Sequence, residues 1–165
     1  MSSAVLMLDL VTYIVDTFSS DKGVAGRAGD LLTKARAIDL PVFHVVPAGM
    51  EDTIHPAVQP AGAEPVLGKR TIGAFGTTDL HGRLQELGVM DLIVAGVATS
   101  GTVLSTTRWA YDMGYRVTVS SDACSDPDAD AHRALVDANV FPQSWLGLWR
   151  IASVLPIGEI EALQR

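Results

Sequence analysis

The chain has 165 residues, 48% of them hydrophobic and 19% charged, a balance typical of a globular domain rather than a disordered chain. Its formal net charge of −7 argues against nonspecific binding to nucleic acid, although a locally positive pocket could still hold a small anion. The single cysteine, Cys124, excludes an intramolecular disulfide, and no apolar run approaches the ~20 residues that a membrane span needs.

These bounds predict one domain over residues 1–165 that has neither a nucleic-acid nor a membrane partner. The first apolar run reaches a charge after five residues and does not resemble a secretory signal. We therefore expect a reducing, cytoplasmic compartment.

Short apolar runs predict strands that are buried on both faces of a sheet. They occupy residues 4–8, 42–46, 92–95, 116–120 and 151–155. Helical spacing of apolar residues predicts helices between these runs. These helices are expected at residues 24–39, 78–87, 102–113, 128–139 and 157–164. The alternation predicts an α/β fold with a mostly parallel, Rossmann-like sheet between two helical layers.

Helix boundaries carry recognisable residues. Thr78 and Asp126 are of the types that cap helix starts, and Pro127 suits a first helical position. Gly88 and Gly114 follow two of the expected helix ends.

Ligands of parallel α/β sheets bind beyond the carboxyl ends of the strands. That rule selects Asp9, the 47–55 loop, residues 96–102 and Asp122. The longer segment 47–77 is rich in proline and glycine and poor in helical pattern, as functional loops often are.

Asp9 ends a buried strand, where desolvation raises the pKa of a carboxylate and suits it to general acid or base catalysis. Its alternative role is to cap a nearby helix. Lys69 could restore the charge of such a carboxylate or orient a substrate, or it could be a solvated loop lysine. Thr102 begins the expected helix after Gly101, where backbone N–H groups can hold an oxyanion, but its hydroxyl could simply cap that helix.

Histidine and cysteine give weaker signals. His55 precedes a proline in the long loop and could line a pocket, whereas His44 is expected to pack in a strand. His81 and His132 are expected on helix surfaces, and Cys124 is expected to pack in a loop. No H-x-H or H-x-x-x-H spacing occurs, so we expect no metal site.

Common motifs for cofactors and serine nucleophiles are missing as well. GxGxxG, GxxxxGK[ST] and GxSxG do not occur, so we expect no bound cofactor and no conventional hydrolase serine.

Three stretches together resemble the isochorismatase-like hydrolases, a superfamily that includes nicotinamidases and other cysteine hydrolases. They are AVLMLDL at residues 4–10, GKRTIGAFGTTDL at residues 68–80, and DLIVAGVATSGTVLSTTRWAYDMGYRVTVSSDA at residues 91–123. The resemblance implies a six-stranded parallel sheet, a catalytic Asp9 and Lys69, and a cis peptide between Val97 and Ala98. It also implies an oxyanion site formed by the N–H groups of Ala98 and Thr102.

Residues expected around the oxyanion and the substrate complete the candidate site. They are Val97, Ala98, Gly101, His55 and Phe75. Family members commonly form dimers or tetramers, so the resemblance also implies a homodimer or homotetramer.

The sequence departs from the family at the nucleophile. Thr102 occupies the position of the family's catalytic cysteine, and Thr106 and Ala110 support this register. Val11 replaces a usual glutamine, and the metal ligands of nicotinamidases are missing.

Three hypotheses follow for the chemistry. Isochorismatases also lack the cysteine: their aspartate protonates a vinyl ether and water attacks the resulting cation, although they tend to have Tyr-Ala where this chain has Ala98-Thr99. We rank first a cysteine-independent hydrolase of a small anionic or carbonyl-bearing molecule, acting through Asp9 and Lys69. A catalytically inactive binding protein ranks second. An amide hydrolase using Thr102 ranks third, because an alcohol is a poor nucleophile without a strong base.

Overall fold

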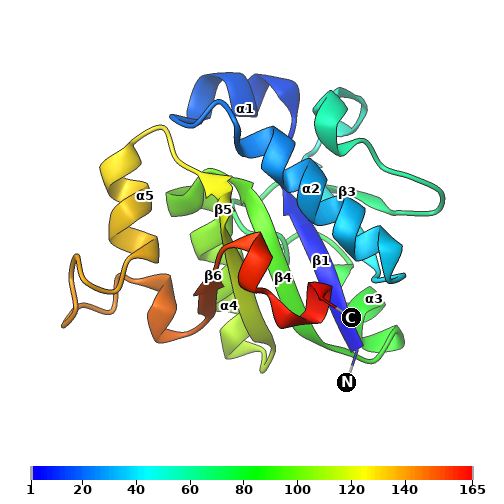
Figure 1. Cartoon of the computed structure of the whole chain (residues 1–165). Helices are drawn as coiled ribbons and strands as arrows, with labels where there is room; N and C mark the ends of the chain where they lie inside the picture. Colours follow the sequence, from blue (N-terminus) through cyan, green and yellow to red (C-terminus); the bar gives the residue numbers. More distant parts are fainter. Residues whose placement is uncertain (1, 165) are drawn as a thin grey trace.

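Six parallel strands form one sheet in the order β3-β2-β1-β4-β5-β6 in the computed structural model, which describes residues 2–164 (Figure 1). The strands are β1 (Ser2–Leu8), β2 (Val42–Pro47), β3 (Val66–Lys69), β4 (Val89–Val97), β5 (Arg116–Ser125) and β6 (Ser153–Leu155). β1 and β4 are nearly continuous apolar runs that are buried on both faces, as central parallel strands require.

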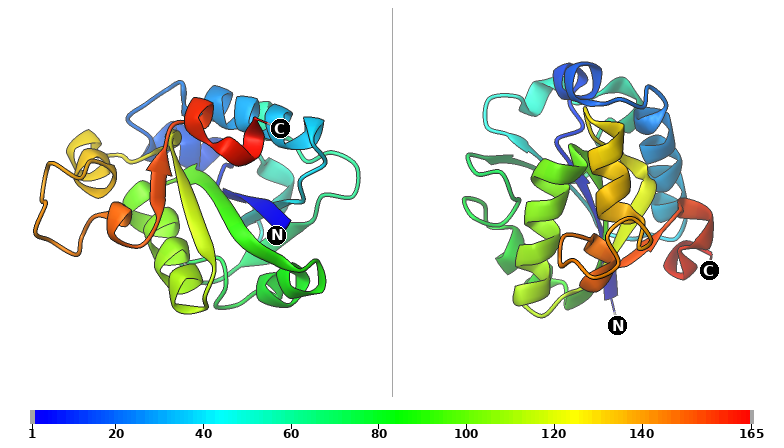
Figure 2. Two further views of the ribbon diagram at one scale, coloured as in Figure 1. Left: turned by 60° about the horizontal axis from the view of Figure 1, so that its bottom comes forward. Right: turned by 90° about the vertical axis from the view of Figure 1, so that its left-hand side faces the viewer.

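Helices cover both faces of this sheet, which confirms the predicted three-layer α/β/α architecture (Figure 2). The α-helices are α1 (Thr12–Phe18), α2 (Val24–Ala37), α3 (Leu80–Glu86), α4 (Leu104–Asp112) and α5 (Ala129–Val136). On one face α2 buries Leu31 and Leu32 together with the C-terminal turns. On the other face α3 and α4 bury residues such as Leu84 and Ala110. The sheet therefore separates two apolar cores.

Two elements were missing from the sequence prediction. β3 lies inside the long 47–77 segment, at an edge of the sheet, where only alternate residues are buried. The sequence there lacks the continuous apolar run of a central strand. α1 is short and fully buries only Val15, so its apolar periodicity is too weak to predict a helix.

The predicted last helix at 157–164 is wrong. Two 3₁₀ turns, Ile157–Glu159 and Glu161–Leu163, occupy this segment instead. Ile157, Ile160 and Leu163 are all buried, and their spacing of three residues matches the period of a 3₁₀ helix rather than that of an α-helix. Three further 3₁₀ turns lie in loops, at Glu51–Thr53, Pro56–Val58 and Leu148–Arg150.

The residues at the observed cap positions differ from the predicted ones, and Asp79 rather than Thr78 is the N-cap of α3. The Thr78 hydroxyl accepts a hydrogen bond from the N–H of Leu80 at the start of α3. The cap of α5, however, is Asp128, whose carboxylate accepts from two N–H groups of its first turn. Asp126, the predicted cap, makes other contacts.

The chain order of the strands creates a switch point at the centre of the sheet. β2 and β3 lie on one side of β1, and β4 lies directly on its other side. Gly96 pairs with Leu8 there, and a Cβ at Gly96 would lie 2.4 Å from the Leu8 carbonyl oxygen. The carboxyl ends of β1 and β4 therefore meet closely, where open α/β sheets bind ligands.

Residues 2–164 contain no helix that is long and apolar enough to cross a membrane.

Candidate active site

Three side chains from separate elements meet at the carboxyl edge of the sheet. Asp9 directly follows β1, Lys69 ends β3, and Thr102 lies in the turn after β4. The Lys69 Nζ donates hydrogen bonds to Asp9 Oδ2 at 2.9 Å and to Thr102 Oγ1 at 3.2 Å. All three residues are buried. The fold thus brings together the three residues predicted to be catalytic.

Burial and polar neighbours shift the pKa of the Asp9 carboxyl in opposite directions. Burial raises its pKa to about 6, although the charge and hydrogen bond of Lys69, and the hydroxyl of Thr102, act to lower it. Among residues 2–164, Asp9 Oδ2 is held by Lys69 while Oδ1 is buried with no hydrogen-bond partner. A buried carboxyl oxygen without a partner is costly, and such groups are concentrated at functional sites.

The loop after β3 holds Lys69 in place. The Lys69 Nζ also donates to the carbonyl oxygen of Ile72. Two residues further along, the N–H of Ala74 donates to the Thr106 hydroxyl of α4 at 3.0 Å. The threonine that supported the sequence register therefore anchors the lysine loop to the helix that follows Thr102.

The turn after β4 has an unusual backbone. The peptide bond between Val97 and Ala98 is cis, and a π-helical turn spans Thr99–Val103. Gly101 has φ −102° and ψ −105°, a conformation outside the helical region. Thr102 makes no side-chain cap at the start of α4, so its hydroxyl is directed to Lys69 instead.

Two expected substrate-binding residues have structural contacts of their own. His55 Nδ1 accepts from the N–H of Ala57 at 3.1 Å and caps a 3₁₀ turn, while the His55 N–H donates to the Leu10 carbonyl beside Asp9. Phe75 is buried and stacks on Tyr115, with ring centroids 6.0 Å apart. His55 therefore lies at the edge of the site, whereas Phe75 packs in the core.

The geometry agrees with the comparison to known domains. A model of the isochorismatase domain matches residues 3–141. The chain belongs to the isochorismatase family. It is a hydrolase of this family with a small-molecule substrate.

Named relatives span much of the chain. An uncharacterized isochorismatase family protein of Bacillus subtilis (strain 168), YddQ, is 31% identical over 156 residues, covering 84% of this chain and 86% of that protein. Nicotinamidase 3 of Arabidopsis thaliana is 33% identical over 100 residues, covering 54% of this chain and 50% of that protein. A solved structure of an isochorismatase family protein from Burkholderia thailandensis has a TM-score of 0.82 at 27% identity, covering 98% of this chain and 95% of that one.

The single cysteine of this isochorismatase-family chain, Cys124, is not a candidate nucleophile. Cys124 lies on β5, and its Sγ faces the Val94 carbonyl at 3.9 Å. Complete burial raises the pKa of the Cys124 thiol to about 12, so almost no thiolate exists at neutral pH. In the described part of the chain, no three His, Cys, Asp or Glu side chains are grouped so as to hold a metal ion.

The sequence missed two side chains that contact the turn Thr99–Val103. Asp126 accepts a hydrogen bond from the N–H of Ser100, and His132 is hydrogen-bonded to the Thr99 hydroxyl. Asp126 was predicted to be a helix cap and His132 a surface residue. Nothing in the local sequence signals these contacts, because each joins residues at least 26 positions apart.

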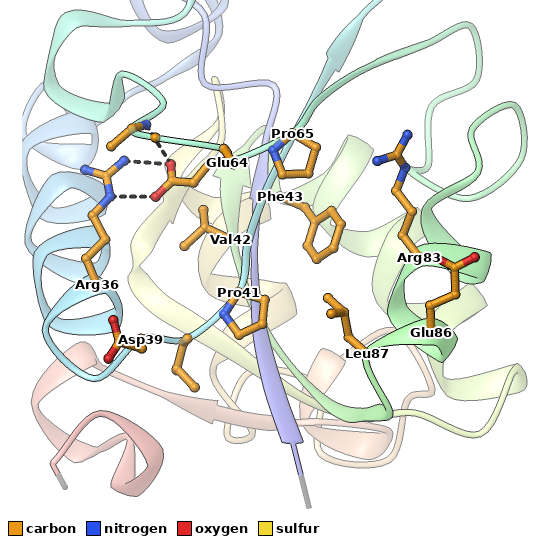
Figure 3. A pocket seen from close by; sticks show the side chains of 14 residues that line it. Arg36, Asp39, Pro41, Val42, Phe43, Glu64, Pro65, Arg83, Glu86 and Leu87 are labelled. Carbon is orange, nitrogen blue, oxygen red and sulfur yellow. Dashed lines mark hydrogen bonds and ion pairs between the residues drawn. The ribbon is translucent and has the colours of Figure 1, made fainter.

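A separate cleft of about 750 Å³ lies at the amino end of β2 (Figure 3). Asp9 follows the carboxyl end of the parallel strand β1, so the cleft and Asp9 are at opposite ends of the strands. Arg36 reaches across to Glu64 on one of its walls, and Arg83 and Glu86 of α3 form the opposite wall. The cleft shares none of the three predicted catalytic residues.

Proposed function

We propose that this isochorismatase-family hydrolase uses Asp9 as its proton donor and acceptor, with Lys69 beside it and without a cysteine nucleophile. The observation that carries the proposal is the state of the Asp9 carboxyl. It is buried, its pKa is raised to about 6, and its Oδ1 has no partner among the described residues. A general acid needs a pKa near the working pH, which Asp9 has, and its unpartnered Oδ1 is the oxygen proposed to carry the transferred proton.

In the proposed reaction, protonated Asp9 gives its proton to the substrate, and water then adds to the carbon that becomes electron-poor. The proton lost by that water returns to the Asp9 carboxylate, so the acid is regenerated. The hemiketal that forms from a vinyl ether then breaks its C–O bond to the leaving group, which departs as an alcohol and leaves a carbonyl compound. Between these steps the Lys69 ammonium, 2.9 Å away, stabilises the carboxylate charge. The N–H groups of Ala98 and Thr102 are proposed to hold a carboxylate or carbonyl oxygen of the substrate.

Thr102 is proposed to orient the site rather than to attack the substrate. The Lys69 ammonium donates to its hydroxyl, and an ammonium that is already donating cannot remove the hydroxyl proton. Cys124 cannot take over, because its thiol is buried with a raised pKa. Acid catalysis by Asp9 with a water nucleophile requires neither group.

The proposed substrate is a small anionic or carbonyl-bearing molecule. A vinyl ether suits direct protonation by Asp9, as the resemblance to isochorismatases implies. An amide is the competing class, since one relative is named a nicotinamidase. Nicotinamide and isochorismate therefore represent the two classes in a first substrate panel.

The test compares Asp9→Asn with Thr102→Ala on a panel of vinyl ethers and amides. We expect Asp9→Asn to lower kcat by about 10²–10⁴-fold, the usual contribution of general acid–base catalysis, and Thr102→Ala to lower it less than tenfold. Asp16→Asn, which changes an exposed acid on α1, is the matched control and should leave kcat unchanged.

Two results would overturn the proposal. One is turnover that survives in Asp9→Asn. The other is turnover that is lost in Thr102→Ala together with an acyl adduct on Thr102 in the intact mass of the working enzyme, which would assign the nucleophile to the threonine.

A further inference from the structure

We propose that Asp126 and His132 are positioning residues that hold the turn Thr99–Val103 against Asp9 and Lys69. This inference rests on the proposed function, because it assigns how the catalytic site is kept in register. Both residues lie outside that site, one directly after β5 and the other on α5.

Asp126 ties the turn to the end of the neighbouring strand. Its Oδ2 accepts from the N–H of Ser100 at 2.8 Å, and its Oδ1 accepts from the N–H of Asp128 at 3.2 Å. The Asp126 carbonyl also accepts from the N–H of Ser20. Asp126 is only 2% exposed, so these bonds are shielded from water and both carboxylate oxygens are used.

His132 holds the first side chain of the same turn. Its Nδ1 lies 2.8 Å from the Thr99 hydroxyl, and Thr99 is completely buried. α5 packs against the turn, which brings His132 to Thr99. Hydrogen bonds therefore hold the turn at two successive residues, through the Thr99 hydroxyl and the Ser100 backbone N–H.

The turn needs such support because its backbone departs from regular helix. Gly101 has non-helical dihedral angles, and the Ala98 carbonyl accepts from the N–H groups of Gly101 and Val103 in place of a regular helical ladder. Thr102 sits between these bonds. A small rotation of the turn would carry its hydroxyl away from Lys69 and Asp9.

Asp126 does not cap α5, although its Oδ1 also accepts from the N–H of the cap residue Asp128. The cap of α5 is made by Asp128, which accepts from the N–H groups of Asp130 and Ala131. Removing the carboxylate of Asp128 should therefore loosen the helix start, whereas removing that of Asp126 should release the turn. Two acids two residues apart thus provide a matched pair for the test.

The readout is the pKa of the Asp9 carboxyl, followed by ¹³C NMR in the full-length protein without any substrate. The Thr102 hydroxyl lowers this pKa in the native site, so loss of the correct turn position should raise it. Thr102→Val sets the upper limit of the expected rise. We expect Asp126→Ala to raise the pKa of Asp9 by less than Thr102→Val does, because the loss of a negative charge acts in the opposite direction, and Asp128→Ala not to raise it.

The direction of this change is diagnostic. Removing a nearby negative charge without moving the turn would lower the pKa of Asp9, because the ionised form would then be repelled less. A rise in Asp126→Ala therefore reports displacement of the turn, whereas a fall, or no change, overturns the role assigned to Asp126.

A second pair tests His132 without changing a carboxylate. His132→Asn keeps a polar atom near the position of Nδ1, whereas His132→Leu keeps bulk but loses the hydrogen bond to Thr99. We expect His132→Leu to raise the pKa of Asp9 and His132→Asn to preserve it. Equal values in the two variants would overturn the role of His132, and this pair also decides the matter if Asp126→Ala fails to fold.

The outcome is separable from that of the proposed function. A raised pKa of Asp9 in Asp126→Ala would support positioning even if Asp9→Asn retained turnover. With an active substrate in hand, the positioning variants should lower kcat by about as much as Thr102→Ala does, with KM little changed. A changed KM with constant kcat would contradict the inference, since it would assign these residues to substrate binding.

Discussion

The Nζ of Lys69 lies 2.9 Å from Oδ2 of Asp9, although the two residues are 60 positions apart in the chain. Both side chains are almost fully buried. Burying an ion pair costs desolvation energy that the attraction only partly offsets, so such a pair is poor evidence for stability. At Asp9 the effect of burial on the pKa exceeds the opposite effect of the Lys69 ammonium, since the pKa is raised. The pair is better explained by its position at the proposed site of proton transfer.

Replacing Lys69 should raise the pKa of Asp9 further. Lys69→Met removes the charge and the hydrogen bond that act against desolvation, so we expect the pKa of Asp9 to rise above its native value of about 6. ¹³C NMR of the aspartate carboxyl carbons across a pH titration measures this directly. Lys34→Met, which changes an exposed lysine of α2, is the control. An unchanged pKa in Lys69→Met would show that the two groups are not coupled.

Restoring a thiol at the turn should create the reactive cysteine that the native chain lacks. In native protein Cys124 is buried with a pKa raised to about 12, and we expect iodoacetamide to leave it unmodified. A thiol at position 102 lies beside the Lys69 ammonium, which favours the thiolate. Thr102→Cys should therefore gain one carbamidomethyl group at position 102, as read by peptide mass spectrometry.

The same variant also tests the amide route. If the site keeps the geometry of the cysteine hydrolases, Thr102→Cys should gain hydrolysis of nicotinamide that Thr102→Ser lacks. Alkylation of Cys124 at the same rate as position 102 would contradict the burial on which this prediction depends.

Gly96 should tolerate no side chain. A Cβ there would lie 2.4 Å from the Leu8 carbonyl oxygen and 2.7 Å from the Leu8 Cβ, so β4 and β1 would have to separate next to the site. We expect Gly96→Ala to reduce the free energy of unfolding by about 1–3 kcal/mol or more, as overpacking of a core does. Urea denaturation measures the change.

Gly26 provides the matched control for that substitution. It lies in α2, and a Cβ added there would meet no neighbouring atom within 4 Å, so Gly26→Ala should stabilise the protein by about 0.5–1 kcal/mol. A loss of stability in Gly26→Ala equal to that in Gly96→Ala would mean that the close approach of the two strands is not the cause.

Glu64 should make stability depend on pH in the acid range. Burial alone would raise its pKa, but hydrogen bonds from Arg36, His44 and the Ala61 N–H outweigh burial and lower it to about 2. An acid with a lowered pKa in the folded state stabilises the protein above its unfolded pKa, here 4.5, and this contribution is lost as pH falls through about 2.

We therefore expect Glu64→Gln to cost about 1–3 kcal/mol of unfolding free energy at pH 7, with the difference from the native protein shrinking between pH 4.5 and 2. Glu86→Gln, an exposed acid across the same cleft, should cost little at any pH (Figure 3). Urea unfolding of the three proteins over this pH range tests the prediction, and a constant difference for Glu64→Gln would refute it.

Most of the fold could be predicted from local patterns. Continuous apolar runs marked β1, β2, β4, β5 and β6, and helical spacing marked α2 to α5. β3 was not predicted because it is short and buried on alternate residues only, without the continuous apolar run that marked the other strands. The two C-terminal 3₁₀ turns were predicted as an α-helix because a spacing of three residues between apolar positions is compatible with both kinds of helix.

The sequence by itself determined the α/β class and predicted the carboxyl edge of the sheet as the place of the site. Both follow from residue type and periodicity, which are local properties, whereas the roles of Asp9, Lys69 and Thr102 were implied by the resemblance to a known family. Only the tertiary structure decided that Oδ1 of Asp9 has no hydrogen-bond partner in the described chain and that the Cys124 thiol is buried. It also decided that Asp126 contacts the turn Thr99–Val103 instead of capping a helix, and that His132 contacts the same turn instead of facing solvent. Burial and hydrogen bonding between distant segments depend on how the strands are ordered in the sheet, and no single segment carries that information.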